Sequence, residues 1–217
     1  MGSMQSFLFT TMCSFPAVLI AITVQGYAKA KMADKLGDKL PRFQGRVTLN
    51  PSAHLDIMGF ILLLVAGFGW TKPIETNPSA YKRGYKDSIK VSVAPILGNL
   101  LTAIIFAVIY VLVVTFLLPL LPVTAAYVLK LMLYYIVWVN ISLMIFHLLP
   151  LPGLCGWNIL KDLKPKLFYK IANTIYQYQM FILLGVVLIG GRILVVPVRI
   201  VFDTLINSIV FILNIFI

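Results

Sequence analysis

Few side chains in this sequence could ligate a metal or act as a nucleophile or general base. The chain has two histidines, His54 and His147, two cysteines, Cys13 and Cys155, and a single glutamate, Glu75. Imidazole and thiolate groups are preferred zinc ligands, so His54, His147 and Cys155 are candidates for a metal site. The prolines that lie between His147 and Cys155 interrupt any helix there, which leaves open whether these two side chains meet.

The composition is that of a membrane protein. Of the 217 residues, 60% are hydrophobic and only 12% are charged, and the mean hydropathy is +0.97. Several apolar runs reach the roughly 20 residues that a helix needs to span a bilayer. The apolar/polar alternation of a membrane β-barrel is missing. The sequence therefore predicts an all-α polytopic membrane protein that is surrounded by the lipid bilayer.

The apolar pattern predicts one membrane domain over residues 1–217, with five or six transmembrane helices. A small extended or β region is expected after the first helix, where Asn50 precedes Pro51. The apolar stretch 57–70 is short and rich in glycine, so it is interpreted as a re-entrant segment or a short span. The expected segments are a helix at 6–30, a cytoplasmic or interfacial region at 31–56, the short segment 57–70, and helices at 91–118, 125–148, 171–189 and 197–217.

Charge favours a particular topology. The stretches 29–46, 72–90 and 161–170 hold six, five and four Lys/Arg, which is fifteen of the eighteen in the chain. They lie on one side of the membrane if 57–70 enters and returns, and the positive-inside rule then makes these loops cytoplasmic. Six crossings remain the alternative, because a short helix can be accommodated by tilt or local thinning. The net charge of +11 is interpreted as attraction to anionic lipid, and no nucleic-acid partner is expected.

Several ordered motifs resemble one known family. The chain from Ala21 to Leu160 is similar to the site-2 protease family of intramembrane zinc metalloproteases, in its bacterial branch. This resemblance implies a location in a bacterial cell membrane. The resemblance rests on the helix 21–30, LGD at Leu36–Asp38, GRVTLNPSAHLDIMG at Gly45–Gly59, FGWTKPIETNP at Phe68–Pro78, SVAPILGN at Ser92–Asn99 and NISLMIFHLLPLPGLCG at Asn140–Gly156.

The resemblance also shows which residues are replaced. In the family, two histidines four residues apart and an aspartate hold Zn²⁺, and a glutamate after the first histidine serves as general base. The corresponding positions here are Gln25 and Lys29 for the histidines, Gly26 for the glutamate and Cys155 for the aspartate. No zinc, no other cofactor and no peptide hydrolysis are therefore expected. The framework positions that could still contact a substrate are Asn50, Pro51, Asn99 and Asn140.

These observations leave several functions open. The leading hypothesis is a proteolytically inactive member of the site-2 protease family that binds a transmembrane substrate or regulatory protein. A deliberately silenced version of an active protease fits the same replacements, and the sequence does not separate it from a natural pseudoenzyme. A transporter or channel is the alternative from another class. The sequence does not determine the oligomeric state.

Overall fold

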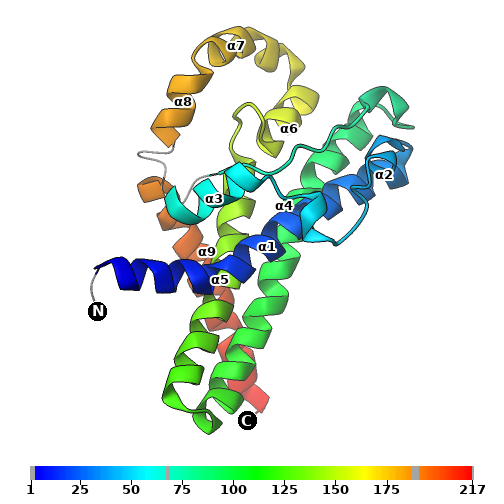
Figure 1. The fold of residues 1–217 in the computed structure, drawn as a ribbon. Coiled ribbons are helices and arrows are strands. Elements are labelled where there is room, and N and C mark those ends of the chain that lie inside the picture. The colour runs from blue at the N-terminus through cyan, green and yellow to red at the C-terminus, as the bar shows by residue number, and fades with distance from the viewer. Residues whose placement is uncertain (1–2, 67–68, 187–190, 217) are drawn as a thin grey trace.

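The computed structural model describes residues 3–66, 69–186 and 191–216 (Figure 1). Over these ranges the chain forms helices and turns, and no strand. Four of its helices are long and apolar enough to cross a membrane, namely α1 (Ser3–Leu36), α4 (Tyr85–Leu112), α5 (Val123–Leu148) and α9 (Gly191–Phe216). The predicted all-helical class is confirmed over these ranges. The structure offers four candidate spans where five or six are predicted, so that count remains a prediction, and the predicted β region has no counterpart among the described residues.

The spanning helices pack closely through small side chains. Alanines 103 and 107 of α4 are fully buried in a core that also contains Val137 and Ile141 of α5 and Phe202 of α9. A Cβ added at Gly98 of α4 would lie 3.1 Å from the Cβ of Ala28 in α1, so glycine permits this close approach. Small residues at such crossings let helix backbones approach each other within a membrane. Figure 1 shows α4, α5 and α9 running alongside one another, with α1 crossing them.

A connection between α1 and α4 wraps over the end of this helical layer. It contains α2 (Leu40–Phe43), the 3-10 turn η1 (Pro51–Ala53), α3 (Ile57–Ala66) and the 3-10 turn η2 (Pro78–Ala80). The buried Asp38 carboxylate joins its two ends, accepting hydrogen bonds from Leu40 N at 3.0 Å and Asn77 N at 2.7 Å. With ten residues, α3 is too short to span a bilayer. Its expected re-entrant path remains a prediction, and residues 67–68 of that segment lie outside the described ranges.

The helix expected over 171–189 is divided in the structure. Residues 165–185 form α7 (Pro165–Gln177) and α8 (Gln179–Gly185), and neither is among the candidate spans. The reason is amphipathicity: Phe168 and Ala172 of α7 pack against Trp157 of α6 (Cys155–Leu163), while Lys166 and Lys170 are exposed. Residues 187–189 of that predicted helix are not described.

A fold with four spans would preserve the charge asymmetry. If all four candidate helices cross, the chain after α1, before α4, after α5 and before α9 lies on the same side. Figure 1 shows the connection with α2 and the helices α6 and α7 at one end of α4 and α5, and the turn between α4 and α5 at the other. The three basic stretches therefore remain together, and their cytoplasmic location remains a prediction.

Candidate functional site

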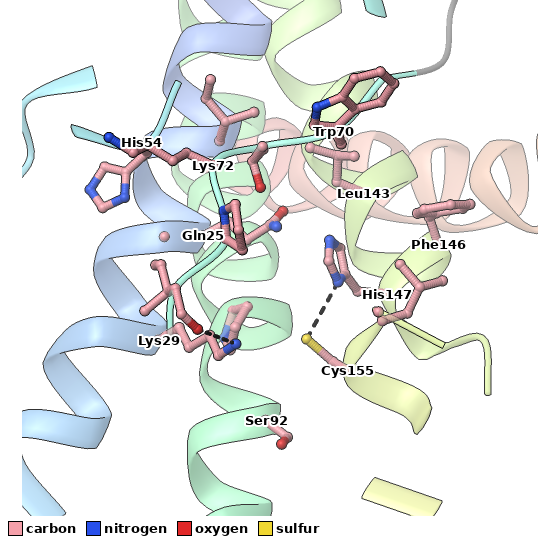
Figure 2. A pocket seen from close by; sticks show the side chains of 18 of the residues that line it. Gln25, Lys29, His54, Trp70, Lys72, Ser92, Leu143, Phe146, His147 and Cys155 are labelled. Atoms are coloured by element: carbon pink, nitrogen blue, oxygen red, sulfur yellow. Dashed lines mark hydrogen bonds between the residues drawn. The ribbon is translucent and has the colours of Figure 1, made fainter. Parts of the chain in front are cut away.

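A cavity of about 260 Å³ lies between α1, α4, α5, the start of α6 and the non-helical stretch that follows α3 (Figure 2). All four positions that the resemblance assigns to zinc chemistry line it, together with both histidines of the chain. These residues are Gln25, Gly26, Lys29, His54, His147 and Cys155. Gln25 and Cys155 are 130 positions apart in the sequence (155 minus 25), and the structure brings both to this cavity.

The α1 wall presents an amide and an ammonium group. Gln25 and Lys29 are four residues apart and share one face of the helix. The Lys29 ammonium donates a hydrogen bond to the carbonyl of Ile74 at 3.1 Å, and the Gln25 carbonyl accepts one from the Asn99 amide at 3.3 Å. Lys29 makes no ion pair with any described residue. A lysine near a helix end can extend toward the interface, but here its charge points into the cavity.

The opposite wall brings a histidine and a cysteine into contact. The Sγ of Cys155 lies 3.4 Å from Nδ1 of His147, although the two residues are eight positions apart. The turn between α5 and α6 makes this possible, with Gly153 at a φ of +88°, a conformation that favours glycine. Burial raises the pKa of the Cys155 thiol to about 11, so this group is neutral near pH 7. The pair therefore lacks the thiolate that a cysteine nucleophile needs.

His54 closes the cavity on the side of Gly26. Its ring is 1% exposed, and its Nε2 donates to the carbonyl of Thr48 at 2.9 Å. Burial lowers the pKa of His54, which favours the neutral ring with its other nitrogen unprotonated. That nitrogen, Nδ1, has no hydrogen-bond partner among the described residues. A Cβ built on Gly26 would lie 2.2 Å from it, so the imidazole occupies the space that a side chain at position 26 would need.

Residues 69–77 form no helix, and residues 69–74 of this stretch line the cavity. The backbone of this stretch is fixed at several points: Lys72 N donates to the His54 carbonyl at 3.0 Å, and Arg46 Nη2 donates to the Pro73 carbonyl at 3.0 Å. Arg46 is 6% exposed, and it also donates to the Ala53 carbonyl. Its role was not predicted from the sequence, although it lies in one of the motifs that carry the resemblance.

The four framework residues expected to contact substrate lie outside the cavity lining. Asn99 is adjacent through its hydrogen bond to Gln25. Asn140 is fully buried in α5, and its amide donates to the Ile136 carbonyl of the same helix. Asn50 is exposed and caps the η1 turn that starts at Pro51, accepting from the backbone of Ser52. The structure therefore gives Asn50, Pro51 and Asn140 local structural roles.

The donor set does not fit the zinc ion that the resemblance implies. Nowhere in the described ranges do three His, Cys, Asp or Glu side chains gather closely enough to hold a metal. His147 and Cys155 meet, but His54 does not complete a ligand set with them. An ammonium group also stands at one of the ligand positions, and it repels a dication. No chemistry through a metal is therefore assigned to these residues.

The contact between Gly26 and His54 leads to a prediction about stability. Gly26→Ala is expected to destabilise the protein by about 2 kcal/mol, because the new methyl group must displace a buried, hydrogen-bonded ring. His54→Ala should relieve this clash, so the double variant should be more stable than the sum of the single changes by about 1 kcal/mol or more. Chemical denaturation in detergent measures the free energy of unfolding of the native protein, the two single variants and the double variant. Strict additivity would show that the two residues do not touch.

Comparison with known proteins supports a metalloprotease-like family. The chain is 35% identical over 199 residues to a Bacillus subtilis (strain 168) protein named "Putative zinc metalloprotease YwhC", which covers 88% of this chain and 90% of the relative. No family model and no solved structure matches the chain. Identity at this level over most of both sequences establishes common ancestry. The chain therefore belongs to the metalloprotease-like family of YwhC.

Proposed function

We propose that this chain has an intramembrane fold of the site-2 protease type, that it does not hydrolyse peptide bonds, and that it binds a membrane-embedded segment of another protein. The observation that carries the proposal is the position of Lys29. Its ammonium lies in the cavity where the resemblance places a metal ligand, hydrogen-bonded to the Ile74 carbonyl. The surrounding framework motifs of the family are retained.

The composition of the cavity argues against hydrolysis. Water attack on a peptide bond requires a general base or a metal-bound water. The described residues that line the cavity include no aspartate and no glutamate. His147 contacts the Cys155 thiol, and His54 has its free nitrogen directed at Gly26. Neither imidazole is thus paired with an acidic group that would orient it as a base.

The non-helical backbone at residues 69–77 supports binding of a partner. An unwound peptide can pair with an extended segment through main-chain hydrogen bonds, while its side chains enter adjacent pockets. Residues 45–51, where the sequence predicts an extended region, are a weaker candidate, because Pro51 begins a 3-10 turn and Asn50 caps it. Trp70 and Thr71 are the better candidates because they line the cavity, whereas the N–H of Lys72 and the carbonyls of Pro73 and Ile74 are already hydrogen-bonded within the chain. No observation favours the transporter or channel alternative.

Site-specific crosslinking tests this proposal. A photoreactive amino acid at Thr71 is expected to crosslink to a co-expressed single-span membrane protein, and the captured protein should remain uncut. The same group at Val123, which is 86% exposed at the start of α5, serves as the control. Equal labelling from both positions would indicate random encounters in the membrane. Cleavage of the captured segment would contradict the predicted inactivity.

A further inference from the structure

The cavity carries an unbalanced positive charge. Two lysines line it, Lys29 and Lys72, and no acidic residue is found among its described lining residues. Lys72 is exposed and can be neutralised by solvent ions, whereas Lys29 is largely enclosed by α1, α4 and the stretch 69–77. A cation that is removed from water is strongly disfavoured unless an anion or several acceptors surround it.

Hydrogen-bond donors in the cavity lack acceptors. The Lys29 ammonium has three N–H groups, and the Ile74 carbonyl is its one recorded acceptor among the described residues. Ser92 of α4 is 6% exposed, lines the same cavity and makes no side-chain hydrogen bond to the described part of the chain. The Gln25 amide group adds further donors. The described lining also holds one unpaired acceptor, His54 Nδ1, and this nitrogen is directed at Gly26. The donors around Lys29 match a ligand that only accepts hydrogen bonds, as a carboxylate does.

Two groups near Lys29, the Cys155 thiol and the Asp162 carboxylate, are the candidates for an internal counter-ion. The Cys155 thiol is neutral near pH 7, because burial raises its pKa to about 11. Asp162 lines a neighbouring cavity that Lys29 also borders, but it forms no ion pair with Lys29 in the described structure. Neither group therefore satisfies the ammonium.

The rest of the lining is apolar. Ile22, Trp70, Leu143 and Phe146 line the cavity, and in the view of Figure 2 Lys29 and Ser92 lie toward one end while Trp70, Leu143 and Phe146 lie toward the other. A ligand that fits has a charged head and an apolar body. A volume of about 260 Å³ accommodates a small group of this kind.

We propose that this cavity binds a carboxylate attached to an apolar group, with the carboxylate at Lys29 and Ser92 and the apolar part against Leu143, Phe146 and Trp70. Two sources share this chemistry: a free aliphatic acid, and the C-terminal carboxylate of a peptide that ends in an apolar residue. The inference goes beyond the function proposed above, because it holds for a free acid even if no partner helix binds.

Calorimetric titration of the full-length protein in detergent tests the proposal with hexanoate and N-acetyl-Leu-Leu as acids, and with hexanamide and N-acetyl-Leu-Leu amide as neutral counterparts. At least one acid should bind saturably, and about tenfold or more tightly than its amide, as expected for a charge-assisted contact. Binding of the peptide acid alone identifies a chain terminus, and binding of hexanoate identifies a free acid. Equal binding of acid and amide, or no binding of either acid, overturns the proposal.

Variants of Lys29 and Ser92 test whether these residues bind the carboxylate. Lys29→Met should weaken binding of the acid about tenfold or more, while Lys29→Arg retains most of the affinity because it keeps the charge. Lys31→Met, on the exposed side of α1, is the matched control and should change the affinity less than about twofold. If Lys29→Met fails to fold, Ser92→Ala tests the same site and should weaken the acid about threefold or more. Unchanged affinity in whichever of these two variants folds overturns the proposal.

A further variant tests the internal counter-ion that lies outside the cavity. Asp162→Asn should leave the affinity for the acid unchanged, because Asp162 does not line the cavity. If this variant raises the affinity by about tenfold or more, Asp162 neutralises Lys29 in the native protein, and the proposed carboxylate site is contradicted.

Discussion

After dialysis against micromolar zinc, the native protein is expected to retain far less than one zinc ion per chain. The triple variant Gln25→His, Lys29→His, Cys155→Asp should instead retain about one, because it supplies the three protein ligands typical of a catalytic zinc site. The structure supports this, since all three positions line one cavity and residues 25 and 29 share a helix face. Elemental analysis of the purified proteins measures the difference.

A double variant isolates the effect of the lysine. Gln25→His with Cys155→Asp retains Lys29, whose ammonium repels the metal, so its zinc content should stay close to that of the native protein. Stoichiometric zinc in the native protein would contradict the expected loss of the metal site. A triple variant without zinc would show that the backbone positions around the cavity no longer match the metal geometry.

Zinc binding and proteolysis are expected to respond differently to substitution in this chain. The sequence suggests that adding Gly26→Glu to the triple change supplies the general base. In the structure, however, the His54 ring lies 2.2 Å from the position of a Cβ on residue 26. The fourfold variant is therefore expected to bind zinc without regaining full proteolysis, because His54 must first move. An assay that follows cleavage of a single-span reporter tests this together with the metal content.

The helical class and the clustering of the replaced residues were predictable, because they depend on short-range periodicity and on motif order. Residues 25 and 29 share a helix face by geometry alone. The contact of His54 with Gly26 depends on the path of the chain after the end of α1 at Leu36, and no local pattern encodes that path. The direction of the Lys29 side chain was not predictable either, because it is set by a hydrogen bond to the Ile74 carbonyl in another segment.

The division of the helix expected over 171–189 into α7 and α8 has a different cause. Mean hydropathy over that stretch suggests a span, but the apolar residues of α7 form a face that packs on Trp157. The indole N–H of Trp157 also donates to the Tyr176 hydroxyl at 2.9 Å, which fixes α7 against α6. Because the apolar face of α7 packs on protein, it does not need lipid to bury it. Mean hydropathy averages over all residues of the stretch and does not show that the apolar ones lie on one face.

Gly156→Ala is expected to destabilise the protein by about 3 kcal/mol, the upper end of the usual cost of overpacking. A Cβ at this position would lie 2.3 Å from the carbonyl oxygen of Leu148 and 2.5 Å from that of Leu149. Both neighbours are backbone atoms, so no side-chain rotation relieves the clash, and the start of α6 must move away from the end of α5. For a chain of this size, the melting temperature should fall by roughly 10 °C.

The same displacement reaches the cavity. Cys155 precedes Gly156 and contacts His147 at 3.4 Å, so a shift of α6 should also separate these two side chains. Reaction of Cys155 with a small maleimide should then become faster, because its burial decreases. Gly185→Ala is the matched control, since nothing lies within 4 Å of the added Cβ at the end of α8, and it should leave both readouts unchanged. Native-like melting and labelling of Gly156→Ala would show that the turn between α5 and α6 adapts, and that the cavity does not depend on this glycine.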